Sequence, residues 1–294
     1  MTPVTLPPMS FLHALILGIV QGATEFLPVS STAHMRIIPA LLGWGDPGTA
    51  YSAIVQLGPI VAIIAFFYSD LVKYLAGIKR SISTGTLFPK DDIDARLGWY
   101  TIFGTIPLAI FGLLLEKKVD HEYRNLYFVA AALILLAGVM LVAEKVGKRT
   151  RDLETLSFKE AMMVGFAQVL ALVPGASRSG TTITAGLFLG LDRESAARFS
   201  FLLSIPAIAL AGVYKLLKVL LAAHKQHLSV HSVAGPYIFS AVVAGIVAYV
   251  VVRWLLGYLS KESHSTTPFI IYRIALGCAL IFLAQIGFLV PEGS

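Results

Sequence analysis

The chain has 294 residues, of which 56% are hydrophobic and only 14% are charged. Because soluble domains carry about 25% charged residues, this composition excludes an ordinary soluble protein and indicates an integral membrane protein. The single cysteine, Cys278, excludes an internal disulfide and a cysteine-rich metal site. The formal charge of +6 is best explained by Lys and Arg in cytoplasmic loops that meet anionic lipids, so we expect no nucleic acid as a partner.

The first hydrophobic segment is interrupted by polar residues. Residues 11–20 are apolar, the stretch around Pro28 is rich in polar side chains, and residues 35–42 are apolar again. A helix that enters the membrane, breaks and returns fits this pattern better than a clean span. Irregular backbone at membrane depth is tolerated only where it is buried in protein or lines a wet cavity. We therefore expect a re-entrant helical hairpin here.

The rest of the chain alternates between apolar runs of membrane-spanning length and charged connections. Three spans are predicted in the first half, at residues 51–68, 97–115 and 126–143, with a polar loop at 70–96 and charged connections at 116–124 and 144–159. A second interrupted segment follows, which is apolar at 161–173, polar at 174–182 and apolar at 183–191. Three more spans are predicted, at residues 199–221, 237–258 and 269–290.

An internal repeat relates the two halves of the chain. A constant shift of 147 positions (165 − 18 = 147 and 206 − 59 = 147) places Gly18 on Gly165 and Pro59 on Pro206, and it also pairs Gln21 with Gln168 and Ser30 with Ser177. Residues 1–147 and 148–294 are therefore predicted to be two repeats within one membrane domain. Each repeat has one broken segment and three spans, and because three is odd the second repeat must be inverted relative to the first.

The predicted fold class is thus an all-α polytopic membrane protein with six transmembrane helices and two re-entrant helical hairpins in an inverted-topology repeat. Lys and Arg gather on the side opposite the N-terminus, in a set that includes Arg253, Lys261 and Arg273. By the positive-inside rule, that side is cytoplasmic. Both termini and the opening of the first hairpin are then expected outside.

The two interrupted segments bring a dense set of polar side chains to membrane depth. The first contributes Gln21, Glu25, Ser30, Ser31, Thr32 and His34, and the second contributes Gln168, Ser177, Arg178, Ser179, Thr181 and Thr182. An ionisable residue in a membrane segment is by default a candidate functional residue. An arginine, many hydroxyl donors and two helix N-termini form an anion site that suits phosphate.

A phosphate site with these groups can also perform catalysis. Ser30 or Ser31 could attack phosphorus, and His34 could take the serine proton or protonate the leaving oxygen. Arg178 would stabilise charge on the phosphoryl oxygens. Glu25 could hold a divalent cation on a diphosphate, because Mg²⁺ needs only one or two carboxylates when phosphate supplies other ligands. The attacking group stays open among the two serines, the histidine and water.

At these residues the chain resembles the undecaprenyl-diphosphate phosphatase family, the bacitracin-resistance type of integral membrane phosphatase. The resemblance covers nearly the whole chain and rests on two motifs. One is Glu/Gln-x-x-x-Glu, here Gln21 to Glu25, which leads into Phe26-Leu-Pro-Val-Ser-Ser-Thr-Ala-His34; the other is Pro-Gly-x-Ser-Arg-Ser-x-x-Thr, here Pro174 to Thr182. The resemblance implies removal of one phosphate from a C55 isoprenyl diphosphate, which recycles the lipid carrier of peptidoglycan synthesis and gives bacitracin resistance.

By motif position the resemblance points to a catalytic set of Glu25, Ser31, His34 and Arg178. We expect substrate phosphates to contact Gln21, Ser30, Thr32, Ser177, Ser179 and Thr182. The resemblance also implies metal dependence and a location in the bacterial inner membrane. We expect the metal to be a divalent cation, Mg²⁺ or Ca²⁺, with Glu25 as its protein ligand, and the distribution of Lys and Arg predicts a periplasmic active-site opening. The expected partners are the isoprenyl diphosphate and the bilayer, and a homodimer is one option for assembly.

A transporter is the alternative function from a different class. Inverted repeats with a site near the bilayer midplane are typical of alternating access, so the chain could flip a lipid phosphate or carry an anion. A carrier needs the anion site but no nucleophile. Ser31 and His34 therefore favour the phosphatase.

Overall fold

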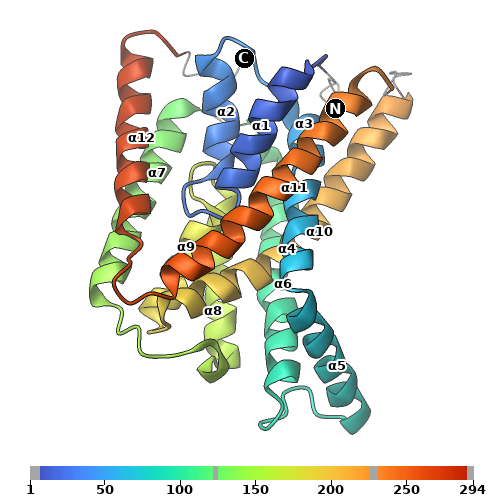
Figure 1. The fold of residues 1–294 in the computed structure, drawn as a ribbon, viewed down its shortest axis with the longest axis vertical. Coiled ribbons are helices and arrows are strands. Elements are labelled where there is room, and N and C mark those ends of the chain that lie inside the picture. Colours follow the sequence, from blue (N-terminus) through green and yellow to red (C-terminus); the bar gives the residue numbers. More distant parts are fainter. Residues whose placement is uncertain (1–6, 122–124, 226–230, 290–294) are drawn as a thin grey trace.

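The computed structural model describes residues 7–121, 125–225 and 231–289, and the regular structure in these ranges is helical (Figure 1). The helices are α1 (Phe11–Thr24), α2 (Ser31–Leu41), α3 (Gly48–Val55), α4 (Leu57–Phe66), α5 (Tyr68–Thr84), α6 (Ile93–His121), α7 (Leu126–Val146), α8 (Phe158–Val169), α9 (Arg178–Phe188), α10 (Arg193–Lys225), α11 (His231–Leu259) and α12 (Thr267–Gln285). Two short 3-10 helices, Leu153–Thr155 and Leu170–Leu172, flank α8.

Within the described ranges, 5 helices are long and apolar enough to cross a membrane. They contain the segments Ile93–Leu115, Leu126–Val146, Arg193–Ala222, Ala234–Leu259 and Thr267–Gln285. The pair α4 and α5 passes the same test together and is bent by 76° at its break, which raises the count to 6. The expectation of a polytopic all-α membrane protein is therefore confirmed. Of the predicted turn at 116–124, α6 takes up the part to His121, and 122–124 lie outside the described residues.

The first predicted span, at residues 51–68, was wrong as a single helix. The structure divides it into α3 and α4, with Gln56 between them. Pro59 explains the break, because a proline has no N–H to donate and its ring clashes with the carbonyl four residues earlier, here that of Val55. A second break at Phe67 then separates α4 from α5.

The predicted polar loop at 70–96 was also wrong over much of its length, because residues 68–84 form α5. This helix buries a stripe of Tyr74, Gly77 and Ser81, whose spacing of three and four residues is that of one helix face. A Cβ on Gly77 would lie 2.4 Å from the backbone nitrogen of Ala95, so α5 packs closely on α6. In Figure 1, α5 and the lower part of α6 form the lower end of the molecule.

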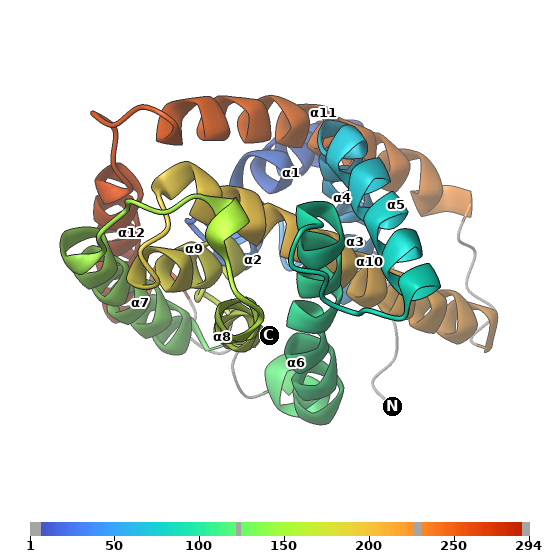
Figure 2. The same ribbon diagram turned by 90° about the horizontal axis from the view of Figure 1, so that it is seen from below.

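The two interrupted segments form helical hairpins that approach each other from opposite ends of the molecule. In Figure 1 the α1–α2 hairpin comes from the upper end and the α8–α9 hairpin from the lower end. In the perpendicular view α2 and α9 lie in the middle, with α7 and α12 on one side and α4 and α10 on the other (Figure 2). The tips of the hairpins therefore meet inside the helical bundle.

The repeat offset found in the sequence recurs in the structure. Residue 11 begins α1 and residue 158 begins α8 (158 − 11 = 147), and residues 31 and 178 begin α2 and α9 in the same way. The close helix contacts repeat as well: a Cβ on Gly18 would lie 2.7 Å from the Ser240 carbonyl oxygen on α11, and a Cβ on Gly165 would lie 2.3 Å from the Gly104 carbonyl oxygen on α6. The division into repeats at residues 1–147 and 148–294 stays a prediction.

Arg151 clamps the base of the α8–α9 hairpin. Its Nη1 lies 2.6 Å from Oε1 of Glu160 in the first turn of α8 and donates to the carbonyl oxygen of Leu189, just after α9, at 3.0 Å. The hydrogen bond from Arg151 is the main cause that lowers the pKa of Glu160 to about 2. This pair fixes both ends of the hairpin outside the spans, so its tip is held in place.

Glu144 forms a second ionic cluster, which joins three helices. Its Oε1 pairs with Arg193 at the start of α10, where the Arg193 Nε lies at 2.8 Å, and with Arg149 at 3.2 Å. Its Oε2 accepts from the hydroxyl of Thr266 at 2.6 Å, directly before α12. The carboxylate is buried, with 6% of the residue exposed.

We predict that Glu144→Ala lowers stability by about 3 kcal/mol, because it leaves the guanidinium of Arg193 without a carboxylate in a mostly buried place. Thermal unfolding in detergent measures the change. The matched control is Arg80→Ala, which removes the exposed pair with Asp92 (2.9 Å) and should change stability little. Equal shifts for the two variants would contradict a structural role for the cluster.

Candidate active site

The helices α2 and α9 begin in the same unusual way. Ser30 and Ser177 are their N-caps, with φ of 74° and 67°, a region that L-residues rarely adopt. The Ser30 hydroxyl accepts from the N–H of Ala33 at 3.4 Å, and the Ser177 hydroxyl accepts from that of Gly180 at 3.1 Å. Such strained residues persist only when the surrounding structure holds them, and they cluster at functional sites. Both helix N-termini start at the meeting point of the hairpins.

The carboxylate of Glu25 joins the two hairpins. Its Oε2 accepts from the amide of Gln21 at 2.7 Å and from the hydroxyl of Ser31 at 2.7 Å. Its Oε1 accepts from Nη2 of Arg178 at 2.6 Å. Gln21 lies one turn earlier on α1, whereas Ser31 and Arg178 are the first residues of α2 and α9. The structure therefore brings four of the predicted site residues into one buried hydrogen-bonded cluster.

The buried hydroxyls of the second hairpin hold its backbone. The Ser179 hydroxyl donates to the Leu27 carbonyl oxygen of the first hairpin at 2.9 Å and lies 3.2 Å from the Ser177 hydroxyl. The Thr182 hydroxyl donates to the Arg178 carbonyl oxygen at 2.8 Å and lies 2.6 Å from that of Ser200. These three predicted phosphate contacts thus already have protein partners, and their geometry indicates that they shape the loop around Arg178.

In the first hairpin, Ser30 and Thr32 have hydroxyls 3.1 Å apart. Ser30 is buried and caps α2, whereas Thr32 is exposed beside Ser31, which is half-buried. Of these hydroxyls, Ser31 is the one that donates to a carboxylate. A hydroxyl that hydrogen-bonds a carboxylate is the arrangement expected of an activated nucleophile.

His34 is held by groups other than the Glu25 cluster. Its Nδ1 lies 2.8 Å from the Ser30 carbonyl oxygen, and its Nε2 lies 2.6 Å from the Tyr272 hydroxyl. Because a carbonyl oxygen only accepts, the neutral ring carries its proton on Nδ1, and the tyrosine then donates to Nε2. The expected contact between Ser31 and His34 is not formed, since Ser31 donates to Glu25 instead.

Arg273 lies in a place that the sequence analysis did not predict. It was assigned to the cytoplasmic cations, but the structure buries it completely on α12 beneath the α8–α9 connection. Its Nη2 donates to the carbonyl oxygens of Gly175 (3.2 Å) and Ala176 (2.9 Å), and a Cβ on Gly180 would lie 2.5 Å from its Nη1. The Nε and Nη1 atoms have no protein partner in the described chain. Its signal in the sequence was an ionisable residue inside an apolar span, like that of Arg178.

The second hairpin lacks the carboxylate of the first. Gln168 is the repeat counterpart of Gln21, but the position that corresponds to Glu25 is Leu172 (172 − 25 = 147). Gln168 is completely buried, and neither atom of its amide has a protein partner in the described residues. The polar site is therefore asymmetric, because its one acid, Glu25, lies directly after α1 in the first hairpin and the second hairpin has none at the matching position.

No group of three or more His, Cys, Asp or Glu side chains that could hold a metal ion is found among the described residues. Of the residues that the structure describes, Glu25 is the only carboxylate in the cluster, and it already accepts three hydrogen bonds. A carboxylate has about four acceptor positions, so one remains for a cation. These residues therefore fit a cation whose ligands come mostly from substrate phosphates. They do not fit a metal site built from protein ligands alone.

Comparison with known proteins identifies the family of the chain. The family model described as "Bacitracin resistance protein BacA" matches residues 14–279. An undecaprenyl-diphosphatase of Pelodictyon phaeoclathratiforme is 47% identical over 292 residues, covering 96% of this chain and 100% of that protein. Undecaprenyl-diphosphatases of Chloroherpeton thalassium and Myxococcus xanthus are each 47% identical, over 95% and 96% of this chain and 98% and 92% of theirs. The chain therefore belongs to the BacA family of bacitracin resistance proteins.

Proposed function

We propose that this chain is an undecaprenyl-diphosphatase, which removes the terminal phosphate of a C55 isoprenyl diphosphate and releases undecaprenyl phosphate and inorganic phosphate. The names of relatives that match almost the full chain support this function. The observation that carries it is the cluster in which Glu25 accepts from the hydroxyl of Ser31 and from Arg178. A diphosphate headgroup needs a polar site at membrane depth, while its apolar tail can leave sideways between helices.

The charges around the hairpin tips favour a phosphate. Arg178 pairs with the carboxylate of Glu25, and Arg273 contacts the backbone of the same loop through Gly175, so these three groups sum to a local charge of +1 (2 − 1 = 1). The N-termini of α2 and α9 add the positive ends of two helix dipoles. Among the described residues, no further protein anion neutralises this positive potential in its low-dielectric surrounding. A bound phosphate supplies the missing charge, and the transition state of phosphoryl transfer increases the demand for it.

We assign the nucleophile to Ser31. As its Oγ attacks the terminal phosphorus, its proton passes to Oε2 of Glu25, the acceptor 2.7 Å away. The bond from phosphorus to the bridging oxygen breaks, undecaprenyl phosphate leaves as a stable anion, and a phosphoserine remains. Water then hydrolyses the phosphoserine, and Glu25 returns the proton to Ser31. Arg178, which pairs with the same carboxylate, is placed to stabilise the phosphoryl oxygens.

His34 has two roles in this scheme. It holds the first turn of α2 in place, and it acts as the base in hydrolysis of the phosphoserine. Its Nδ1 contact with the Ser30 carbonyl oxygen holds the strained first turn of α2, from which Ser31 projects. When the Tyr272 hydroxyl moves aside, the lone pair on Nε2 can accept a proton from the hydrolytic water. Tyr272 thus fixes the tautomer of His34 before substrate binds.

We also propose that a divalent cation, Mg²⁺ or Ca²⁺, binds with the diphosphate, with Glu25 as its protein ligand. When bound, the cation would neutralise negative charge on the phosphate oxygens. The chain lies in the membrane through its multiple spans. The distribution of Lys and Arg supports an orientation in which both termini and the active-site opening face the periplasm.

We predict that Glu25→Ala and Arg178→Ala each lower phosphate release from a polyprenyl diphosphate by at least about a hundredfold, because each removes a group used in the transition state. The assay uses purified protein in detergent, with gel filtration and thermal unfolding to check that the variants fold. The control Asp92→Ala breaks the exposed ion pair with Arg80, which takes no part in the hairpin cluster, and should keep full activity. Full activity in either site variant would contradict the mechanism, and a folded wild type that moves lipid phosphate without hydrolysis would favour the transporter.

We predict that rapid quenching with substrate labelled in its terminal phosphate traps the label on Ser31. The Ser31→Ala variant should lose the trapped label, and Ser30→Ala should keep it, because Ser30 serves as the cap of α2. Peptide sequencing after proteolysis identifies the labelled residue. Label on His34, or a burst of phosphate without any labelled protein, would show that Ser31 is not the nucleophile.

We predict that Arg273→Met weakens inhibition by inorganic phosphate about tenfold, because it removes a buried positive charge that lies under the loop of Arg178. Arg273→Lys should restore much of this affinity, since it returns the charge without the full hydrogen-bonding pattern. The inhibition constant is the informative measurement, because a purely structural change would lower the amount of active enzyme and leave that constant unchanged. An unaltered constant in Arg273→Met would contradict an electrostatic role.

A further inference from the structure

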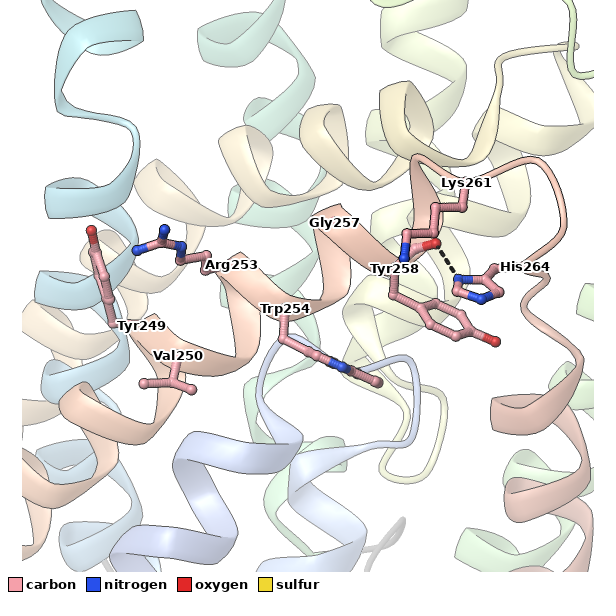
Figure 3. A pocket seen from close by; sticks show the side chains of 8 residues that line it. All are labelled: Tyr249, Val250, Arg253, Trp254, Gly257, Tyr258, Lys261 and His264. Carbon is pink, nitrogen blue, oxygen red and sulfur yellow. Dashed lines mark hydrogen bonds between the residues drawn. The ribbon is translucent and has the colours of Figure 1, made fainter.

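A cavity of about 610 Å³ lies along the C-terminal part of α11, and none of its lining residues belongs to the hairpin site (Figure 3). Two rows of side chains line it, each with the four-residue spacing that places residues on one helix face. One row contains Tyr249, Arg253 and Gly257 and is continued by Lys261, just after α11 ends at Leu259, and the other contains Val250, Trp254 and Tyr258. The connection to α12 adds His264. One side of the cavity is therefore cationic and the other apolar.

The cationic row has an opening at its centre. A Cβ on Gly257 would meet no atom within 4 Å, so the space above this residue is empty. Arg253 and Lys261 lie four residues away on either side. The Arg253 guanidinium is directed toward Tyr249 in Figure 3, and rotation about its side-chain bonds would bring it over Gly257. Figure 3 shows Arg253 on one side of Gly257, and Lys261 with His264 on the other.

Among the described residues, these two cations have no acid to neutralise them. Neither the Arg253 guanidinium nor the Lys261 ammonium has a hydrogen-bond or ion-pair partner in this part of the chain, and no described Asp or Glu lines the cavity. A neighbouring cavity of about 520 Å³ differs in this respect, because it mixes the cations Lys148, Arg149 and Arg193 with the acids Asp152, Asp192, Glu194 and Glu262. The cavity on α11 is thus selectively suited to an anion.

The apolar row is rigid and faces outward. Trp254 stacks on Tyr258 with ring centroids 5.4 Å apart, and Tyr258 stacks on His264 at 4.2 Å. Phe269 closes the back of both Trp254 and Tyr258 with edge contacts. Even so, 51% of Trp254 is exposed. Aromatic rings with this exposure at the end of a span are typical of the headgroup level of a bilayer.

We propose that this cavity binds the phosphate headgroup of an anionic phospholipid from the surrounding leaflet. The span Ala234–Leu259 ends at the cavity, which therefore lies at the depth of lipid headgroups. The phosphate lies over Gly257 between Arg253 and Lys261, and an acyl chain runs along the apolar row. Basic pockets beside transmembrane helices are suited to such headgroups by charge, and rings beside them suit the glycerol and the first methylenes. No residue of the hairpin site takes part.

Native mass spectrometry of the purified protein, with phosphatidylglycerol or phosphatidylcholine added, tests the proposal. The wild type should retain one phosphatidylglycerol in clear preference to phosphatidylcholine. In Arg253→Gln/Lys261→Gln the affinity for phosphatidylglycerol should fall by about tenfold or more, because each cation near a lipid surface contributes to binding. The matched control Lys73→Gln/Lys79→Gln removes the same charge from exposed positions of α5 and should retain the lipid.

Three results would overturn this site: equal retention of phosphatidylglycerol in the cavity variant and the wild type, equal binding of both lipids by the wild type, or displacement of phosphatidylglycerol by a polyprenyl phosphate at lower concentration. The last result would assign the cavity to an isoprenyl lipid instead. Phosphate release in detergent should stay at the wild-type level in both double variants. The outcome for the lipid site is therefore independent of the outcome for the hairpin site.

Discussion

The negative charge of a carboxylate inside a membrane protein must be balanced by hydrogen-bond donors or a cation. The donors that balance the charge of Glu25 determine how the two hairpins are arranged. Its donors come from three helices: Gln21 from α1, Ser31 from α2 and Arg178 from α9. A buried ion pair that loses one partner leaves an uncompensated charge, so α9 must stay against the first hairpin. The close glycine contacts of α1 with α11 and of α8 with α6 hold each hairpin in the depth that this pair requires.

The repeat explains how one scaffold supplies two different groups to one ligand. Residues 31 and 178 are equivalent by the 147-residue shift (178 − 31 = 147), and each begins a helix after a serine with positive φ. One position carries the hydroxyl and the other the guanidinium, so the same backbone geometry presents a nucleophile from one side and a cation from the other. The equivalent of Glu25 is Leu172, which leaves a single carboxylate to serve both. The proposed phosphatase thus depends on divergence between the repeats at these positions.

The polar hairpins could be predicted because their signals are local: polar residues and a proline within an apolar run, followed by a serine-rich stretch. Tyr272 was missed because its partner His34 is 238 residues away, and no local pattern marks that contact. Arg273 was misplaced because a cation in the first turns of a span usually reaches the interface, whereas this one is buried under the second hairpin. Helix α5 was missed because its sequence is polar over most of its surface and only the stripe of Tyr74, Gly77 and Ser81 is buried. These contacts depend on tertiary packing, which composition alone does not contain.

A double-mutant cycle between Glu25 and Arg178 tests the shared carboxylate most directly. Thermal or denaturant stability is measured for Glu25→Gln, Arg178→Gln and the double variant, in the same detergent and without substrate. If the pair holds the hairpins together, the double variant should be less destabilised than the sum of the single variants, with a coupling of about 1–3 kcal/mol. Additive effects, with no coupling beyond error, would show that the two side chains do not interact and would contradict the account of the site.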